Sequence, residues 1–318
     1  MPWKPKSQRR VVRFLLRFKR FRVEDSVIIF SEARGGSTWL MQLLGKLPRT
    51  IINWEPFHAD RGILPTKHPW GHFLYVRPDA DDQELSKLMI DTLTLRKHSL
   101  WTLNYAERAL FVQTVITKFV RANALVPWIL NNFSFKRKPI YLLRHPIATC
   151  KSKLRAFGED QLTESGAFPN DWIHDPENNR HLEFYHSLES PLERKIAIWC
   201  IHNVKTLNSP EVQQKCLWVF YEDLVVDPKG EMKRILSSLG LENSDQFLSK
   251  LKFRKRTRTD FKRDFLKDPD AQLAKTFDGL DDLMCTRIQR IFDYFDFRLY
   301  TARNVLPLKD GYEHLKTL

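Results

Sequence analysis

The feature that most constrains this chain is a glycine turn that joins an apolar run to a helix-like segment. The stretch SEARGGSTWL, residues 31–40, follows directly on VIIF and continues into MQLLGKL. Gly35 and Gly36 permit a tight turn and a close approach of the backbone to a ligand. Ser37 and Thr38 add hydroxyl groups where the first N–H groups of a helix have no intrahelical partner. A strand, a glycine turn and a helix N-terminus together predict a site for an anion.

Short apolar runs separated by helical patterns predict an α/β fold. Five runs have the composition of buried strands, namely residues 27–30, 51–54, 115–119, 140–143 and 217–221. Strands that alternate with helices indicate a mainly parallel sheet with helices on both faces. Ligands of such sheets bind beyond the carboxyl ends of the strands. Arg34, Glu55 and Arg144 fall at those ends.

Helical signals lie between these runs. The helices expected from apolar spacing and proline position span residues 37–46, 191–207 and 228–239, with a further helix from Pro146. Residues 57–78 and 157–187 are richer in loop signals and contain aromatic side chains. Loops of this kind are either binding loops or surface elaborations, and the pattern does not favour one over the other.

Length and composition indicate one globular domain in a reducing compartment. The chain has 318 residues and only four cysteines, none in a CxxC pair, which argues against a disulfide framework. We therefore expect a cytoplasmic protein. With no internal repeat or low-complexity linker, the expected organisation is a basic arm over residues 1–24, a main domain over 25–302 and a tail over 303–318.

The positive charge is concentrated at the N-terminus. Residues 1–22 carry nine Lys or Arg and no acid, which leaves about +5 of the formal net charge of +14 for the rest of the chain. The arm is too short and too charged to span a bilayer. One interpretation is an amphipathic helix on an anionic membrane surface, and the other is a solvated arm packed against the body. Nucleic-acid binding is not expected, because no reader motif accompanies the charge.

The glycine turn is not the phosphate loop of an ATPase. A Walker A loop reads GxxxxGK[ST], whereas here Arg34 precedes the glycines and no lysine precedes the hydroxyls. A second signal is PIYLLRHPIATCKSKL, in which Arg144 ends an apolar run and Ser152 follows eight residues later. Arginine is a permanently charged fork that suits phosphate. A local ion pair for Arg144 is the alternative, but beside the first loop a phosphate site is favoured.

Three segments, in this order, resemble those of sulfotransferases that use 3′-phosphoadenosine 5′-phosphosulfate (PAPS). RGGSTWL, residues 34–40, is similar to that family's 5′-phosphosulfate loop. IYLLRHPIATCKSKL resembles its 3′-phosphate motif, and FYEDLVVDPKGEMKRILSSLGL, residues 220–241, resembles a strand–loop–helix of the same enzymes. The likeness spans roughly residues 27–300 and implies a P-loop-NTPase-like α/β fold.

The resemblance implies which residues bind PAPS. They are Arg34, Gly35, Gly36, Ser37, Thr38 and Trp39 in the first loop, and Arg144 and Ser152 at the 3′-phosphate. Arg34 is also implied to stabilise charge on the bridging oxygen of the leaving phosphate. The family often has lysine there, and arginine is the poorer proton donor. Trp39 is expected to supply its backbone N–H while its ring faces the core.

The acceptor side resembles the carbohydrate branch of the family. WEPFH, residues 54–58, is similar to the YEP segment of carbohydrate sulfotransferases. The implied acceptor is a hydroxyl of a glycan or glycolipid. Glu55 is the expected catalytic base, with His58 as the alternative base, and pairing of Glu55 with a basic side chain is its alternative role. No metal is expected, because His58, His68 and His72 do not make a persuasive ligand set.

Three questions stay open in the sequence. Lys118 and Arg121 face the acceptor or cofactor, or are solvated charges at a helix start. The basic run of residues 252–265 either closes over the 3′-phosphate, through Arg256 or Arg258, or is a solvated surface. The alternative acceptors are a small alcohol, a sterol or a lipid headgroup, and the alternative class is a non-catalytic nucleotide-binding protein.

Overall fold

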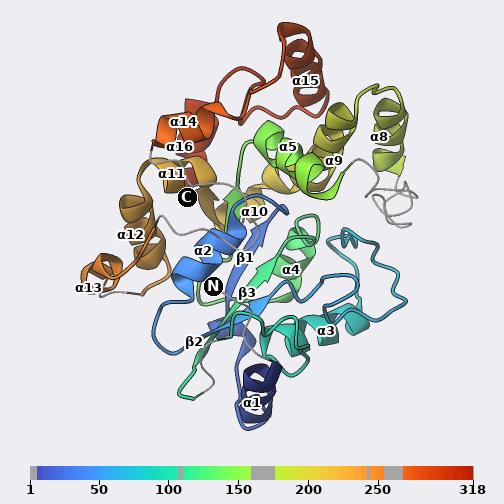
Figure 1. The fold of residues 1–318 in the computed structure, drawn as a ribbon. Helices are drawn as coiled ribbons and strands as arrows, with labels where there is room; N and C mark the ends of the chain where they lie inside the picture. Colours follow the sequence, from blue (N-terminus) through green and yellow to red (C-terminus); the bar gives the residue numbers. More distant parts are fainter. Residues whose placement is uncertain (1–5, 107–109, 159–175, 242–243, 254–267, 318) are drawn as a thin grey trace.

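The core of the molecule is a five-stranded, all-parallel sheet (Figure 1). The computed structural model describes residues 6–106, 110–158, 176–241, 244–253 and 268–317. The strands are β1 (Val27–Ser31), β2 (Thr50–Trp54), β3 (Thr114–Phe119), β4 (Ile140–Leu143) and β5 (Leu217–Phe220), in the order β2-β3-β1-β4-β5. The predicted α/β class and all five predicted strands are confirmed. The last strand ends one residue early, because Tyr221 begins a helix.

The register of the strands brings their carboxyl ends to one edge of the sheet. Lys118 of β3 lies opposite Ile29 of β1 and Trp54 of β2. Ser31 at the end of β1 lies opposite Leu142 of β4. The segments that follow β1, β2 and β4 therefore leave the sheet close to one another, as a ligand site of this fold requires.

Helices cover both faces of the sheet (Figure 1). Val27 and Ile29 pack in a cluster with α2 and α12, whereas Ile28 and Phe30 pack on the opposite face with α4 and α9. This alternation is what the two-residue period of a strand dictates. The helices are α1 (Lys6–Leu16), α2 (Ser37–Leu44), α3 (Gln83–Leu93), α4 (Val126–Asn132), α5 (Pro146–Phe157), α8 (Pro176–His186), α9 (Pro191–Leu207), α10 (Pro210–Lys215), α11 (Tyr221–Val226), α12 (Pro228–Ser238), α13 (Ser244–Ser249), α14 (Pro269–Ala274), α15 (Asp282–Tyr294) and α16 (Lys309–Thr317).

Local signals set the helix starts as expected. Pro191 occupies the first turn of α9, and Ser190 and Glu193 form a reciprocal capping box at its N-terminus. Pro146 opens α5 in the same way. The first of the two loop-rich segments is packed rather than superficial, because Phe57 and Trp70 are buried in the main core. Most of the second segment lies outside the described residues.

The N-terminal arm forms a helix that packs on the body of the protein. Val12 and Leu16 of α1 share a cluster with Phe21, with Ile51 of β2 and with Val115 of β3. β2 is an edge strand of the sheet, so α1 lies beside that edge, at the bottom of Figure 1. One face of the arm therefore packs against the body, as one of the two interpretations of the arm expected.

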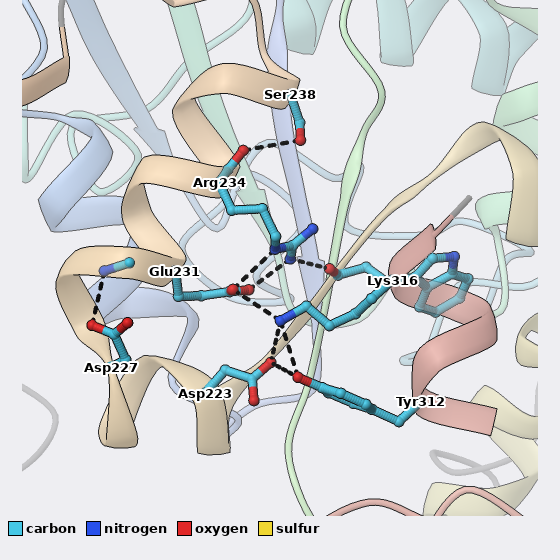
Figure 2. A network of polar contacts seen from close by, with 9 residues as sticks. Asp223, Asp227, Glu231, Arg234, Ser238, Tyr312 and Lys316 are labelled. Carbon is cyan, nitrogen blue, oxygen red and sulfur yellow. Dashed lines mark hydrogen bonds and ion pairs between the residues drawn. The ribbon is translucent and has the colours of Figure 1, made fainter. Parts of the chain in front are cut away.

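The C-terminal helix α16 is held by a network of charges on α11 and α12 (Figure 2). Lys316 Nζ lies 2.7 Å from Asp223 Oδ2 and 3.1 Å from Glu231 Oε2. Tyr312 donates a hydrogen bond to the same Asp223 oxygen at 2.9 Å, and Arg234 pairs with Glu231. One lysine thus joins the last helix to the segment that follows β5.

Replacing Lys316 by methionine should destabilise the fold. Lys316→Met removes a half-buried cation from two carboxylates, so we expect the free energy of unfolding to fall by about 1–3 kcal/mol, between the values for exposed and buried pairs. Denaturant unfolding measures the change. Lys309→Met is the matched control on the same helix, because Lys309 is exposed and lies 3.9 Å from Glu313. Equal stability of the two variants would show that the network does not hold α16.

Candidate active site

The turn between β1 and α2 has a backbone that only its two glycines permit. Gly36 has φ of 95°, and a Cβ at this position would lie 2.4 Å from the ring of Tyr221. A Cβ at Gly35 would lie 2.9 Å from the carbonyl oxygen of Glu32. Arg34 itself is left-handed, with φ of 70°. The backbone of the turn is therefore strained and packs directly against Tyr221 and the Glu32 carbonyl, as expected of a rigid ligand-binding loop.

The N-terminus of α2 leaves amide groups for an anion. The residue at the N-cap is Gly36, so no N-cap side chain accepts a hydrogen bond from the first N–H groups of the helix. Within the described ranges, no backbone carbonyl accepts a hydrogen bond from the N–H groups of Gly36, Ser37 or Thr38. The N–H of Trp39 is bonded to the Gly36 carbonyl at 2.9 Å, and its ring is buried. Of the four backbone N–H groups expected to face the 5′-phosphosulfate, those of Gly36, Ser37 and Thr38 remain available, and that of Trp39 does not. The predicted core position of the Trp39 ring is confirmed.

The two predicted phosphate segments are in direct contact. Arg34 Nε donates to Ser152 Oγ at 3.0 Å, and Arg144 Nη1 donates to the Arg34 carbonyl at 3.0 Å. The Arg144 guanidinium lies 4.4 Å from the centre of the Tyr221 ring. No carboxylate in the described part of the chain forms an ion pair with Arg144, so the local pair that was its alternative role is not found there. The two segments therefore lie side by side.

His145 anchors the strand end that carries Arg144. Its backbone N–H donates to Glu222 Oε1 at 3.0 Å. Its Nδ1 accepts from the N–H of Ile147 at 3.2 Å, and its Nε2 donates to the carbonyls of Thr301 and Asn304, both at 3.1 Å. Burial lowers the pKa of His145 to about 3, against its ordinary value of 6.5. The ring is therefore neutral and fixes the start of α5 to the C-terminal segment.

A buried lysine joins the second strand end to the glycine turn. Lys118 is 1% exposed, and its Nζ donates to Glu55 Oε1 at 2.5 Å and to Thr38 Oγ1 at 3.1 Å. Burial lowers the pKa of Lys118, and the charge of Glu55 opposes that shift. Lys118 lies within β3 and is buried, so of the two roles left open for it the solvated charge at a helix start is excluded. Lys118 was not among the catalytic residues expected from the sequence. A lysine within the apolar run TVITKF could have indicated a buried, functional cation.

Glu55 lies at the predicted strand end and pairs with Lys118, and this contact leaves its expected role as the base a prediction. Its φ of 45° and its N–H bond to the Lys118 carbonyl fix its position. Nearby, His58 accepts a weak hydrogen bond at Nδ1 from the N–H of Asp60 at 3.3 Å. Burial, and then the charge of Arg121, lowers the pKa of His58. Its neutral ring therefore carries its proton on Nε2, which disfavours Nε2 as the base in this arrangement.

Aromatic and basic side chains surround these two candidates for the base. Trp101 stacks on Trp54 with ring centres 4.4 Å apart, and the His58 ring lies 5.1 Å from Trp101. Nη1 of Arg121 is buried and has no hydrogen-bond partner within the described ranges. Arg121 is thus a charged group on the Glu55 side of the site, since Glu55 acts on its pKa.

The start of the basic run, at Phe253, and Gln272 beyond the run both contact side chains beside the glycine turn. Trp39 Nε1 donates to the carbonyl of Phe253 at 3.0 Å, and Gln272 Nε2 lies 3.4 Å from the Tyr221 hydroxyl. Arg256 and Arg258 themselves lie outside the described residues, so their predicted role stays a prediction. In the described part of the chain, no group of three His, Cys, Asp or Glu side chains is arranged to hold a metal ion.

The parallel sheet and the glycine turn between β1 and α2 define a P-loop-like α/β protein. The sequence pattern described as "Sulfotransferase family" matches residues 26–245. That match covers more than half of the chain, and the chain belongs to the sulfotransferase family. A comparison with curated protein sequences found no significant match.

Solved sulfotransferase structures resemble the chain at low identity. The sulfotransferase domain from the curacin biosynthetic pathway has 18% identity and a TM-score of 0.43, over 86% of this chain and 98% of that chain. Mouse sulfotransferase SULT7A1 complexed with PAP has 14% identity and a TM-score of 0.44, over 97% of this chain and 93% of that chain. The family assignment does not depend on these scores.

Stability should fall in acid because His145 is buried in its neutral form. Its pKa is lowered in the folded protein, so between pH 6.5 and about 3 the unfolded chain binds one more proton at this residue. The free energy of unfolding should therefore fall by about 1.4 kcal/mol per pH unit for this residue alone. His145→Asn keeps an acceptor near Nδ1 and should flatten the slope near pH 5 by that amount. Denaturant unfolding across this pH range measures it.

The control for this prediction is His314→Asn, because His314 is an exposed histidine of α16. It should leave the slope unchanged. An unchanged slope in His145→Asn as well would mean that His145 does not titrate on unfolding.

Proposed function

We propose that the protein transfers the sulfuryl group of PAPS to a hydroxyl of a carbohydrate acceptor, which yields a sulfate ester and 3′-phosphoadenosine 5′-phosphate (PAP). The observation that carries the proposal is the contact between the two phosphate segments. Arg144 bonds to the carbonyl of Arg34, and Arg34 bonds to Ser152. Two guanidinium groups and three helix amides therefore converge where one doubly phosphorylated nucleotide fits.

In this proposal each segment holds one end of the nucleotide. The amides of Gly36, Ser37 and Thr38 bind the 5′-phosphosulfate, and Arg144 with Ser152 binds the 3′-phosphate. A guanidinium whose protein partners are a carbonyl and an aromatic face retains donors for phosphate oxygens. This pattern favours a nucleotide with a 3′-phosphate over ATP.

The reaction is an in-line displacement at sulfur. The acceptor oxygen forms a bond to sulfur, the bond from sulfur to the bridging phosphate oxygen breaks, and the acceptor proton passes to Glu55. Lys118 and Arg34 stabilise the charge that develops on the transferred group and on the leaving oxygen. Support comes from the contact of Lys118 with both Glu55 and Thr38, which connects the base to the cradle.

A sugar acceptor is favoured by the side chains around Glu55. Trp101 is partly exposed beside His58, and Arg61 lies 4.9 Å from the centre of its ring. Aromatic faces with polar neighbours suit a polyhydroxylated ring better than a sterol. We further propose a cytoplasmic location, supported by four cysteines that are all free and buried.

The acceptor class is tested by transfer of label from PAPS to a panel of glycans, small alcohols, sterols and lipid headgroups. We expect labelled product from a glycan or glycolipid. Turnover of PAPS with sterols or simple alcohols alone would remove the carbohydrate part of the proposal and leave the sulfotransferase part intact.

Arg144→Gln should weaken PAP binding selectively. Loss of hydrogen bonds to a charged phosphate costs about 1.5–3 kcal/mol, or roughly 10- to 150-fold in affinity. AMP lacks the 3′-phosphate, so its affinity should be unchanged. Titration calorimetry with both nucleotides measures the difference, with Arg290→Gln as the control, because Arg290 is an exposed residue of α15. Equal losses for PAP and AMP would contradict the 3′-phosphate assignment.

Glu55→Gln should lower turnover by about 100-fold or more while PAP affinity stays near normal, because the base acts only in the chemical step. It should also shift the alkaline limb of the rate to lower pH. The charge of Glu55 raises the pKa of Lys118 against the effect of burial, so its removal lets Lys118 lose its proton earlier. Glu211→Gln is the control, since Glu211 also pairs with a lysine but on an exposed helix. An unaffected rate in Glu55→Gln would assign the base elsewhere.

A further inference from the structure

The N-terminal helix α1 buries only one of its faces. Arg9, Val12 and Leu16 are 7%, 5% and 5% exposed and point into the body of the protein. Arg9 donates hydrogen bonds to the Leu100 carbonyl at 2.8 Å and to Asn104 Oδ1 at 2.7 Å. The helix is therefore fixed in orientation, and its opposite face is a defined surface.

That opposite face carries an apolar stripe. Val11, Phe14 and Phe18 follow one another at three- and four-residue spacing and are 58%, 55% and 73% exposed. The two phenyl rings lie edge to face, with centres 5.4 Å apart. Val11 and Phe14 share one face of α1 at this spacing, and Phe18 in the turn after the helix continues that strip through its contact with Phe14.

The loop before β3 extends the apolar surface. Leu110 and Phe111 are 59% and 79% exposed, while the next residue, Val112, packs in the cluster under α1. Phe111 has φ of 59°, an uncommon conformation for a bulky residue. Of the ten exposed large apolar side chains in the described part of the chain, five belong to α1, the turn directly after it and this loop. Scattered exposure is ordinary, but this concentration is not.

A basic stripe runs beside the apolar one. Lys6, Arg10, Arg13 and Arg17 are exposed and recur at three- and four-residue spacing. No acidic residue occurs in residues 1–22, so no carboxylate of this stretch neutralises them. The surface thus combines exposed aromatic rings with a row of cations. No helix in the described ranges has the length and apolar character needed to cross a membrane.

We propose that this surface docks on an anionic lipid bilayer. We call it the docking surface, and it consists of Val11, Phe14, Phe18, Leu110, Phe111, Lys6, Arg10, Arg13 and Arg17. The rings enter the boundary between headgroups and acyl chains, and the cations lie at the lipid phosphates. A helix with these two stripes lies in the plane of the interface.

Charge and shape favour a bilayer over the other occupants. A nucleic acid would use the cations but leave three phenylalanine rings in water. A second copy of the chain would cover the rings in a two-fold contact but place each basic stripe against itself. An anionic bilayer accommodates both stripes at once.

The docking surface is attached to the edge of the sheet that carries the expected base. α1 packs on Ile51 of β2, and Glu55 directly follows β2. Arg9 bonds to the segment that carries Trp101, which stacks on Trp54. Docking would therefore hold the acceptor side of the molecule close to the lipid headgroups.

The test is co-sedimentation of the full chain with vesicles, which needs no catalytic activity and so does not depend on the sulfotransferase proposal. We expect binding to vesicles of phosphatidylcholine with phosphatidylserine, little binding to phosphatidylcholine alone, and weaker binding as salt rises. Phe14→Ser with Phe18→Ser should lower the partition coefficient by about tenfold or more. Arg10→Ser, Arg13→Ser and Arg17→Ser together should do the same.

Matched variants remove equal numbers of side chains elsewhere. Leu283→Ser with Leu306→Ser removes two exposed leucines, and Arg290→Ser, Arg298→Ser and Lys309→Ser remove three exposed cations. α15, which carries Leu283, lies at the opposite end of the molecule from α1 (Figure 1). These controls should bind vesicles as the native chain does. All variants should unfold at the native temperature, because the replaced side chains are exposed.

Three results would overturn the proposal. The first is a native chain that does not sediment with anionic vesicles, and the second is equal loss of binding in the docking and control variants. The third is a concentration-dependent dimer, or binding to duplex DNA, that the docking variants abolish although they still bind vesicles as the native chain does. Either of these would identify another occupant of the surface.

Discussion

One backbone carbonyl connects the two halves of the site. The Arg34 oxygen accepts a hydrogen bond from Arg144 because Arg34 adopts a left-handed conformation with φ of 70°. That conformation follows from the tight turn, in which Gly36 lies directly against the Tyr221 ring. The same ring lies under the Arg144 guanidinium. A side chain at Gly36 would thus displace the turn, Tyr221 and Arg144 together.

The cations of the candidate site are held in place by burial and pairing. Lys118 is almost fully buried, which is costly for an ammonium group unless it is paired. Glu55 supplies the pair, and burial still lowers the pKa of the lysine. His58 and His145 are kept neutral by burial, so the positive charge comes from lysine and arginine. A bound phosphate would offset the cost of holding these cations together.

Much of the candidate site was predictable from the sequence, because its residues directly follow the carboxyl ends of the strands. Each apolar run in the sequence became a strand, and residues that follow parallel strands meet at one edge of the sheet. Arg34, Arg144 and Ser152 were therefore expected to lie together, and they do. Lys118 was not recognised as the partner of Glu55, because pairing across β2 and β3 depends on strand order rather than on sequence separation.

The sequence by itself determined the class of fold, the glycine turn that leads into a helix, and the amphipathic N-terminal helix, because each depends on the spacing of nearby residues. Only the tertiary structure decided which groups touch. The order of the strands placed Lys118 between Thr38 and Glu55, and packing against the sheet edge decided which face of α1 is buried and which is exposed. Such contacts join residues far apart in the chain, and local periodicity carries no information about them.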